Sequence, residues 1–546
     1  MVTITQLIGG VFLAWLIRQL FLFRQLIKAY QDVPNFCVVF SPYMPWNYFP
    51  PFRTLKVPGI FHPMRSLTDN YAMYERFQSD VFLVIHMIPL GARIYVADIH
   101  AIKDITTARN TFHKPVKMYQ SISMYGNNMV ASEGSEWSRY RKACASSFSD
   151  RNLQLVWDSA ARIMQEIFTS WSGRPEIRIP ISKDWTLKVA LHVLSAAGFG
   201  IPISWAETDK SAPADRNQSF HAALSRTMDQ FLWRFILPIF VWGSEADREA
   251  VAVAGLVGKG WLGAKPKQAL QTFSELNGYM HEMIDERRAL GITDNEKDLL
   301  SNLIRASDAD DGEGAPLSFR EVTGNMFVFM IAGHETSGHT LAFMFALLAL
   351  DLEEQQRLYD HIKSVLGDKE PTYNDFNSLS RVLAALHETL RLYPPVINIP
   401  KECMSDATVT IRATGGEKIE ATRTIAIVRG TMISINTTGV SYNPRYWKDP
   451  ETFNPSRFLE DPSRSRDGTF LPFSAGARSC IGRRFSEVES VAIATLLILR
   501  YKISIDTQFF KEVEGESMME RRRRLLKTDQ RVTQFPVGVP LVFTRR

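Results

Sequence analysis

The feature that most restricts the fold is the segment 325–350, NMFVFMIAGHETSGHTLAFMFALLAL, which is apolar on almost every side. A helix that is hydrophobic all round is buried. The centre of the segment, GHETSGH at 333–339, is polar and rich in small residues, which lower helix propensity and free local carbonyls. A buried helix with such a centre is typical of a helix beside a ligand. The alternative is a core helix whose polar side chains are satisfied within the protein.

The two histidines of this segment suggest the HExxH motif of zinc proteases. That motif needs histidines four residues apart, because this spacing puts both on one helix face. His334 and His339 are five apart and point roughly 140° away from each other at about 100° per residue. The spacing therefore argues against a zinc site. Packing or a solvent network is the expected role of both residues.

The N-terminus predicts a membrane anchor. Residues 1–17 carry no charge, and residues 4–23 are predominantly apolar over 20 residues, a length that spans a bilayer. Basic residues follow on the C-terminal side, so the positive-inside rule places the rest of the chain in the cytosol. A short helix lying in the membrane surface is the alternative. We expect an anchor at 1–28, a stiff proline- and aromatic-rich hinge at 29–52 and one catalytic domain at 53–546.

The composition fits a large helical domain and excludes some classes. A net charge of +5 over 546 residues gives no indication of nucleic-acid binding. The four cysteines are far apart and form no CxxC pair, which predicts free thiols in a reducing compartment. Helical patterns dominate, and strand-like alternation occurs at 407–413 and 424–436. The sequence therefore predicts a mainly α fold with a small β portion.

The loop FLPFSAGARSCIG at 470–482 places one cysteine in a special setting. Cys480 follows a glycine-containing turn and precedes a helical pattern. A helix N-terminus stabilises a thiolate through its dipole and its free amides, and Arg478 adds positive charge. A redox or nucleophilic cysteine would need a resolving cysteine or a histidine base, and neither has a matching pattern. The loop therefore predicts a thiolate that binds a metal.

Residues 473–482 match FxxGxRxCxG at every fixed position, and this pattern resembles the haem-ligand signature of the cytochrome P450 family. The resemblance covers roughly residues 50–546 and implies the single large α-rich domain of that fold, preceded by one transmembrane helix of the microsomal type. Further motifs of the family occur in its order: WSRYR with Trp137 and Arg141, AGHET at 332–336, HETLR with Glu388 and Arg391, and FNPSRF with Arg457.

The resemblance assigns roles near the iron. Cys480 would be the metal ligand, and a thiolate on haem iron favours O–O cleavage. Glu335 and Thr336 would be the acid–alcohol pair that delivers protons to bound oxygen, and Gly333 would open a groove for dioxygen. The residues that would hold haem b are Trp137, Arg141, Lys401, Phe473, Gly476, Arg478 and Gly482.

The resemblance also implies a structural network and a substrate pocket. Glu388 and Arg391 are neighbours on one helix face, and with Arg457 they would form a buried ionic network of structural importance. The apolar segment 231–243 resembles a pocket roof and a membrane-facing entrance, although an ordinary core helix fits it equally. The expected pocket residues are Phe327, Met330, Ala332, Val396, Ile397 and Asn398.

The implied activity is reductase-dependent monooxygenation. One atom of O2 would enter a lipophilic substrate, such as a terpenoid, a sterol, another secondary metabolite or a fatty acyl compound. Electrons would come from NADPH through NADPH-cytochrome P450 reductase, with cytochrome b5 as a further donor. The segment GKGWLG at 258–263 lacks the βαβ context of a dinucleotide site. Basic residues expected to attract the acidic donor are Arg139, Lys142, Arg483 and Arg484.

The expected location is the endoplasmic reticulum membrane, with the catalytic domain facing the cytosol. The sequons at Asn217 and Asn436 would then stay unmodified. Two other functions remain open. One is a haem-thiolate isomerase or dehydratase that acts on a peroxide without O2. The other is a non-catalytic, membrane-bound haem sensor or carrier.

Overall fold

The segment 325–350 lies within one long helix, as its sequence predicts. In the computed structural model, α13 (Phe319–Leu350) runs for 32 residues and begins with a capping box formed by Ser318 and Glu321. The polar centre does not interrupt it. The hydroxyls of Thr336 and Thr340 donate 2.7 Å hydrogen bonds to the carbonyls four residues earlier, which satisfies them within the helix.

The structure describes residues 4–44, 55–60, 70–207, 216–230, 265–292, 298–308, 316–412 and 422–546. Within the chain, two units form. Unit 1 comprises Met1–Pro115, His387–Cys480 and Gln530–Gln534, and unit 2 comprises Val116–Leu386, Ile481–Asp529 and Phe535–Arg546. The segments 231–243 and 258–263, which carry the expected pocket roof and the glycine-rich motif, lie outside the described residues.

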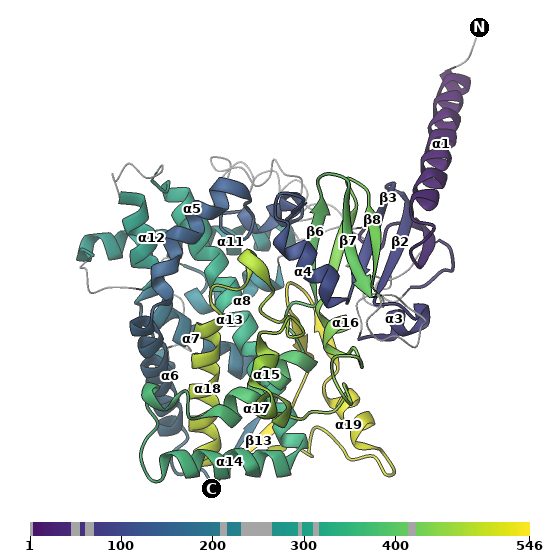
Figure 1. Cartoon of the computed structure of the whole chain (residues 1–546). Helices are drawn as coiled ribbons and strands as arrows, with labels where there is room; N and C mark the ends of the chain where they lie inside the picture. The colour runs from purple at the N-terminus through teal and green to yellow at the C-terminus, as the bar shows by residue number, and fades with distance from the viewer. Residues whose placement is uncertain are drawn as a thin grey trace. The chain divides into compact units, whose positions relative to one another are not determined.

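Unit 1 contains a six-stranded mixed sheet in the order β1-β2-β3-β9-β6-β4. Figure 1 labels β2, β3 and β6 of this sheet. Its strands are rich in β-branched and aromatic residues, as in VFLVIHMI of β2. Its helices and strands are α1 (Ile4–Ala29), β1 (Asn35–Phe40), α3 (Ala72–Phe77), β2 (Val81–Ile88), β3 (Gly91–Val96), α4 (Ile99–Thr107), β4 (Phe112–His113), β6 (Asn398–Cys403), β7 (Ala407–Arg412), β8 (Thr422–Ile427), β9 (Met432–Asn436), α16 (Thr437–Ser441), α17 (Ser456–Glu460), η7 (Pro462–Ser465) and η8 (Gly476–Arg478).

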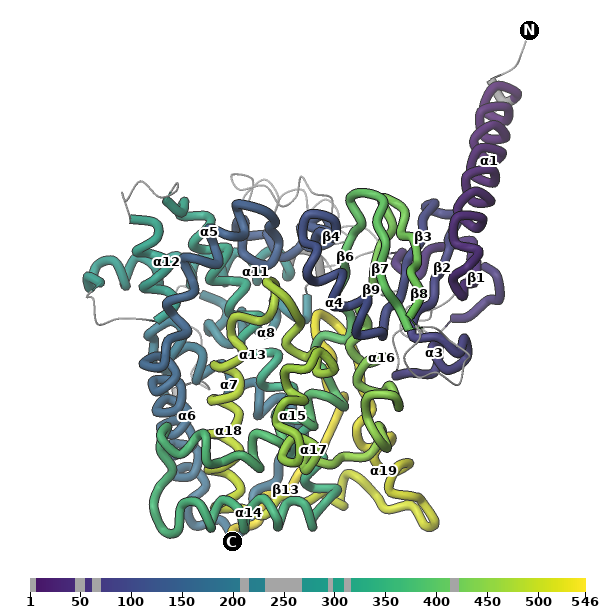
Figure 2. Tube along the Cα trace, viewed as in Figure 1, coloured from purple at the N-terminus to yellow at the C-terminus, as the bar shows by residue number. Residues whose placement is uncertain are grey.

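The start of the predicted hinge belongs to this sheet, which corrects the expectation for the described part of 29–52. The apolar sequence NFCVVF forms β1 and pairs in parallel with β2. The side chain of Tyr30 is buried, and its hydroxyl lies 2.6 Å from that of Thr431 and accepts a 3.0 Å hydrogen bond from the amide of Val428. Residues 45–52 lie outside the described residues. Figure 2 shows α1 leading into β1 through the short segment between them.

Unit 2 is mostly helical. Helix α13 packs against α7 and α18, and its buried side chains are mainly Phe, Leu, Met and Ala. The helices and strands of unit 2 are η2 (Val116–Ser123), α5 (Gly134–Ala145), η3 (Ser146–Phe148), α6 (Asp150–Ser170), β5 (Glu176–Ile179), α7 (Ser182–Phe199), η4 (Trp205–Glu207), α8 (Phe220–Asp229), α11 (Lys265–Leu290), α12 (Leu299–Asp308), α13, α14 (Leu352–Leu366), η6 (Tyr373–Asp375), α18 (Arg483–Arg500), β10 (Tyr501–Ile505), α19 (Met518–Leu525) and β13 (Leu541–Arg545).

The remaining strands form small sheets. In unit 2, β10, β13 and β5 make an antiparallel three-stranded sheet. In unit 1, β7 and β8 pair as an antiparallel hairpin. Three elements each contain a point at which the chain passes from one unit to the other. They are α15 (Ser380–Leu392), β11 (Thr528–Gln530) and β12 (Gln534–Pro536). The predicted balance of many helices and a small β portion is confirmed.

Candidate active site

Cys480 ends unit 1 in a loop that its sequence shapes closely. The amide of Cys480 donates a 2.8 Å hydrogen bond to the carbonyl of Phe473, which closes the loop. Gly476 has a φ of +68°, and a Cβ added there would lie 2.7 Å from the carbonyl oxygen of Thr106 in α4, so only glycine fits. Cys480 is exposed, whereas Cys144 and Cys403 are buried. The loop therefore holds an accessible thiol in a fixed backbone.

The other haem-binding candidates of unit 1 differ in their exposure. Phe473 is buried beside Phe470, and Arg478 is half-buried in η8. Lys401 is buried in β6, where its Nζ donates a 3.3 Å hydrogen bond to the carbonyl of Phe112. Gly482 belongs to unit 2 and caps α18 with a φ of −85°, which any residue adopts. Glycine is therefore required by the backbone at Gly476 and not at Gly482.

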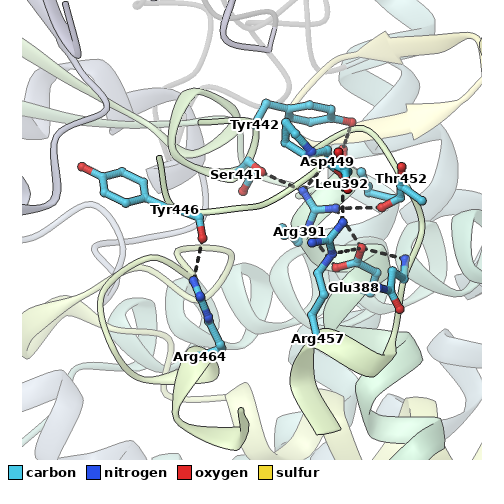
Figure 3. A network of polar contacts seen from close by, with 12 residues as sticks. Glu388, Arg391, Leu392, Ser441, Tyr442, Tyr446, Asp449, Thr452, Arg457 and Arg464 are labelled. Atoms are coloured by element: carbon cyan, nitrogen blue, oxygen red, sulfur yellow. Dashed lines mark hydrogen bonds and ion pairs between the residues drawn. The ribbon is translucent and has the colours of Figure 1, made fainter. Parts of the chain in front are cut away.

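The charged network of unit 1 forms as the motifs predict. Arg391 donates two 2.8 Å hydrogen bonds to the carboxylate of Glu388, and both side chains have no exposed surface. Arg457 donates a 3.3 Å hydrogen bond to the same carboxylate (Figure 3). The backbone amide of Asn454 donates another at 2.9 Å. Glu388 therefore accepts hydrogen bonds on both oxygens, as a buried carboxylate must.

Arg391 also fixes the chain that follows α16. Its remaining donors reach the carbonyls of Ser441 and Pro450 at 2.7 Å each and of Thr452 at 3.2 Å, so all five N–H groups of the guanidinium have acceptors (Figure 3). The guanidinium also lies 5.2 Å from the ring centroid of Trp447. This position has a structural role, because every donor is engaged by the protein itself.

One face of α13 is accessible in the middle of an otherwise buried helix. Ala332 is exposed, and Glu335 and Thr336 are half-buried, while their neighbours in the helix are mostly buried. Positions three and four apart share a helix face, so these three side chains form one accessible strip. The predicted acid–alcohol pair therefore lies together on a face that a ligand can reach.

Gly333 is half-buried and lies against α7. A Cβ added at Gly333 would lie 2.9 Å from Cδ2 and 3.0 Å from Cδ1 of Leu194 in α7. A Cβ at Gly338 would lie 2.9 Å from the Cα of Leu187 in the same helix. Both glycines therefore let α13 approach α7 closely, and at Gly338 a side chain would meet the backbone of α7 itself.

The histidines of α13 are held in the core. His334 shares a 2.6 Å hydrogen bond with the carbonyl of Met330, and burial lowers its pKa to about 4, so the ring is neutral at pH 7. The ring centroid of His339 lies 5.3 Å from that of Phe535. In the part of the chain that the structure describes, His, Cys, Asp and Glu form no cluster of three that could hold a metal. The packing role expected of both histidines agrees with these contacts.

Helix α5 carries the WxxxR motif and part of the expected donor surface. Trp137 and Arg141 are half-buried, four residues apart, and Cζ of Arg141 lies 5.9 Å from the ring centroid of Trp137. Arg139, on the same helix, pairs with Glu321 and donates a 3.1 Å hydrogen bond to the carbonyl of Pro316. This cation is therefore largely compensated within unit 2.

The other basic residues of the expected donor surface are also engaged. Arg483 pairs with Glu487 at 2.9 Å. Arg484 lies 3.5 Å from the same carboxylate and stacks on Phe376 at 4.3 Å. Only Lys142 of the four is exposed. The positive electrostatic potential that these four basic residues produce in solvent is therefore weaker than their number suggests.

The expected pocket residues separate into accessible and buried sets. Val396 is exposed, Ile397 is buried, and Asn398 opens β6 with a buried Oδ1 that has no hydrogen-bond partner. Phe327 and Met330 are fully buried, and the ring of Phe327 packs edge-on against Tyr125 at 4.6 Å. The structure therefore places these two in the core of unit 2, with Ala332 on the accessible strip.

Sequence reasoning missed a buried acid in α18. Glu489 has no exposed surface, and neither carboxylate oxygen accepts a hydrogen bond. Burial raises its pKa to about 8. The signal that was available is its setting, because an acid directly before the apolar run SVAIATLLIL has little access to water.

Comparison with known proteins agrees with the motifs. The family model described as Cytochrome P450 matches residues 92–527. "Cytochrome P450 monooxygenase 124" of Postia placenta is 39% identical over 86% of this chain and 86% of its own length. "Cytochrome P450 monooxygenase ORF6" of Penicillium roqueforti is 27% identical over 78% of this chain and 76% of its own length.

A bacterial relative and a solved structure extend the comparison. "Cyclooctat-9-en-7-ol 5-monooxygenase" of Streptomyces melanosporofaciens is 34% identical over 42% of this chain and 47% of its own length. The crystal structure titled as a cytochrome P450, CYP102L1, superposes with a TM-score of 0.69 at 18% identity, over 89% of this chain and 98% of that one, and shows the same fold. The chain belongs to the cytochrome P450 family and is an oxygen-incorporating oxidoreductase.

Proposed function

We propose that this chain is a membrane-anchored monooxygenase that inserts one oxygen atom of O2 into a lipophilic substrate. The observation that carries the proposal is the exposed thiol of Cys480 in a loop whose backbone Gly476 and Phe473 fix. The family implies haem iron, for which a thiolate is a suitable ligand. The alternatives without O2 chemistry have no comparable support, because the named relatives are monooxygenases.

The residues of each unit fit a haem. The loop of unit 1 supplies an accessible thiol, and Gly476 leaves no side chain where the backbone approaches α4. Cys480 would bind the iron, and the family motifs assign Arg478, Lys401, Trp137 and Arg141 to the propionates. When bound, the haem supplies the redox chemistry by which O2 is reduced and its O–O bond broken.

The accessible strip of α13 suits proton delivery. Thr336 donates its hydroxyl proton to the carbonyl of Ala332 at 2.7 Å, so its Oγ1 is oriented with free acceptor capacity. Glu335, the adjacent half-buried side chain, is an acid that can resupply a proton from solvent. We assign these two residues the catalytic roles, with proton transfer passing through Oγ1 of Thr336.

The substrate we propose is lipophilic and reaches the enzyme from the membrane. Among the described residues, α1 is the one helix that is long and apolar enough to cross a bilayer, and its most apolar window of 18 residues has a mean hydropathy of 1.6. The Streptomyces relative is named for cyclooctat-9-en-7-ol, a cyclic alkenol. We place the anchor in the endoplasmic reticulum membrane with the catalytic domain in the cytosol. There the enzyme would meet NADPH-cytochrome P450 reductase as its electron donor, and cytochrome b5 as a second donor. In that orientation the sequon at Asn217 faces the cytosol, and Asn436 is in any case fully buried.

The test is product identification in microsomes that contain the full chain and a reductase. We would supply a lipid-extract library with NADPH under ¹⁸O2 and search for products by mass spectrometry. The expected result is an NADPH-dependent product that is heavier than its precursor by one ¹⁸O atom and is absent with Cys480→Ser. Unlabelled products that form without NADPH would instead support an isomerase or dehydratase. Stoichiometric haem without NADPH consumption would support a sensor or carrier.

A further inference from the structure

Helix α13 begins with a carboxylate that contacts two helices at once. Oε2 of Glu321 accepts hydrogen bonds from the amide of Ser318 at 2.8 Å and from its hydroxyl at 3.0 Å, which completes the capping box of α13. Oε1 contacts α5 instead, where it pairs with Arg139 and accepts a 2.5 Å hydrogen bond from the hydroxyl of Tyr140. A capping box needs only one of the two oxygens, so the contacts with α5 have a separate role.

The α5 side of this contact supplies donors to an ionised acceptor. Tyr140 has no exposed surface, and burial and its hydrogen bonds to Glu321 and Glu136 raise its pKa, so its hydroxyl remains a donor. Partial burial alone would raise the pKa of Glu321, but the hydrogen bonds from Tyr140 and Ser318 lower it. A hydrogen bond to a charged acceptor is stronger than one between neutral groups. Glu321 therefore holds α5 as a carboxylate.

Tyr140 lies between the two α5 residues that the family motifs assign to the haem propionates. At 3.6 residues per turn, Trp137 and Arg141 project about 60° and 100° around the helix from Tyr140, on the same side of it. Both are half-buried, and Cζ of Arg141 lies 5.9 Å from the ring centroid of Trp137. A contact that fixes Tyr140 therefore also fixes the direction in which these two side chains point.

A second set of contacts attaches the segment before α5 to α13 without the carboxylate. The amide of Met129 donates a 2.9 Å hydrogen bond to Oδ1 of Asn325. A Cβ added at Gly324 would lie 2.5 Å from the carbonyl oxygen of Gly126, so the two backbones are in contact. This attachment remains when the carboxylate is changed, whereas the contacts of the carboxylate act on α5 itself.

We propose that Glu321 is a positioning residue for haem, because it orients the propionate-binding residues of α5 through its contacts with Arg139 and Tyr140. The assignment of Trp137 and Arg141 to the propionates rests on the proposed function. The contacts of the carboxylate rest on the structure of unit 2 alone. Loss of the carboxylate should therefore let haem dissociate faster without unfolding the protein.

The experiment measures how fast ferric haem passes from the purified full-length protein in detergent to excess apomyoglobin. Glu321→Gln keeps a side chain that a capping box accepts but removes the charge that holds α5. It should raise the transfer rate roughly tenfold, because charge-assisted contacts are lost. Tyr140→Phe removes only the hydroxyl, should also raise the rate, and tests the contact from α5 if Glu321→Gln does not fold. The double variant should transfer haem no faster than Glu321→Gln, because both changes remove the same contact.

Glu354→Gln is the matched control within unit 2. Glu354 occupies the same position in α14 as Glu321 in α13, three residues after the N-cap Asp351, and pairs with Arg381 at 2.7 Å. Because this pair is also largely buried, the variant should lower the thermal midpoint of the protein. It should leave the haem transfer rate unchanged, since α14 carries no residue that is assigned to haem.

Three results would overturn the proposal, and they separate it from the proposed function. Unchanged transfer in Glu321→Gln and Tyr140→Phe, with faster transfer in Arg141→Gln, would remove the positioning role and keep the propionate assignment. Unchanged transfer in Arg141→Gln and Trp137→Phe would remove the assignment and the positioning role together. Equal acceleration in Glu321→Gln and Glu354→Gln would show a general loss of stability in place of a positioning role.

Discussion

Single residues of the candidate site are placed by backbone constraints as much as by their chemistry. Gly476 has a positive φ and touches the carbonyl of Thr106, and it thereby fixes the turn that presents Cys480. Gly333 and Gly338 instead allow α13 to approach α7. The same residue type therefore serves a loop in one case and helix packing in the other, and only the surrounding contacts separate the two roles.

Cys480 should determine the spectrum of the haem protein. Its thiolate should give the reduced carbon monoxide complex a far-red Soret band, because sulfur ligation donates electron density to the iron. Cys480→Ser should lose that band while the protein stays folded. The control is Cys37→Ser, which changes a half-buried thiol in β1 of the same unit. A far-red band that persists in Cys480→Ser would mean that another residue is the ligand.

Thr336 should control how many electrons reach the product. Thr336→Ala should still bind haem and consume NADPH, but more of the electrons should appear as hydrogen peroxide, and product formation should fall by up to about 10²-fold. Thr340→Ala is the matched control, because Thr340 makes the equivalent hydrogen bond one turn later but is buried. Product per NADPH that is the same in all three proteins would remove Thr336 from the mechanism.

At the scale of elements, two buried acids have contrasting surroundings. Glu388 of α15 lies among arginines and an amide, so its charge is fully compensated. Glu489 of α18 has no such partners and is protonated at neutral pH, because burial raises its pKa to about 8. The ExxR motif predicted the first environment. No motif in the sequence predicted the second, since it depends on how α18 packs against α6, α13 and α14.

The network around Arg391 should resist even conservative change. Arg391→Lys cannot reproduce five N–H donors, and it would leave Glu388 and the carbonyls of Ser441 and Pro450 partly unsatisfied. We expect a loss of about 3–5 kcal/mol in the free energy of unfolding, measured by urea titration of the haem protein. Arg464→Lys is the control, because that side chain is half-exposed and bonds the carbonyl of Tyr446 nearby (Figure 3). Equal losses in the two variants would contradict the buried-network interpretation.

Glu489 should make stability fall as pH rises. An ordinary glutamate ionises near pH 4.5 in the unfolded chain, whereas the folded group stays protonated up to about pH 8. Between these values the folded state binds one more proton, so its stability decreases by up to about 1.4 kcal/mol per pH unit and levels off above pH 8.

Glu489→Gln, which is neutral at every pH, should remove that contribution. Urea midpoints from pH 5 to 8.5 would be compared with those of the wild type and of Glu353→Gln, an exposed position on α14. A wild-type slope that is unchanged in Glu489→Gln would show that the acid is ionised in the folded protein.

At the scale of the whole molecule, the sequence predicted features that depend on a local motif. It did not predict features that depend on contacts between distant segments. The motifs predicted the contacts among Glu388, Arg391 and Arg457, and the helical patterns predicted the mostly helical fold, because each depends on residue type at a fixed local spacing. The role of Cys480 as the iron ligand stays a prediction. The motifs did not predict that residues 35–40 pair with β2, since strand pairing joins segments far apart in the chain.

The contacts of Tyr30 with the six-stranded sheet of unit 1 determine how much of the N-terminus can be deleted without loss of stability. Deleting residues 1–28 should release the protein from the membrane fraction, because it removes nearly all of α1. It should leave the fold intact, since Tyr30 and its hydrogen bonds to Thr431 and Val428 remain. Deleting residues 1–34 should release the protein equally but lower its thermal midpoint, because Tyr30 and the joint to the sheet are lost.

The Tyr30→Phe variant of the shorter deletion separates the hydroxyl from the rest of the segment. Removing one partner of a buried hydrogen-bonded hydroxyl costs about 1–3 kcal/mol, so this variant should fall between the two deletions. Carbonate extraction followed by thermal denaturation would measure both properties on the same preparations. Equal thermal midpoints for the two deletions would mean that residues 29–34 act as a mere linker. A full-length chain found in the soluble fraction would show that α1 does not span the membrane.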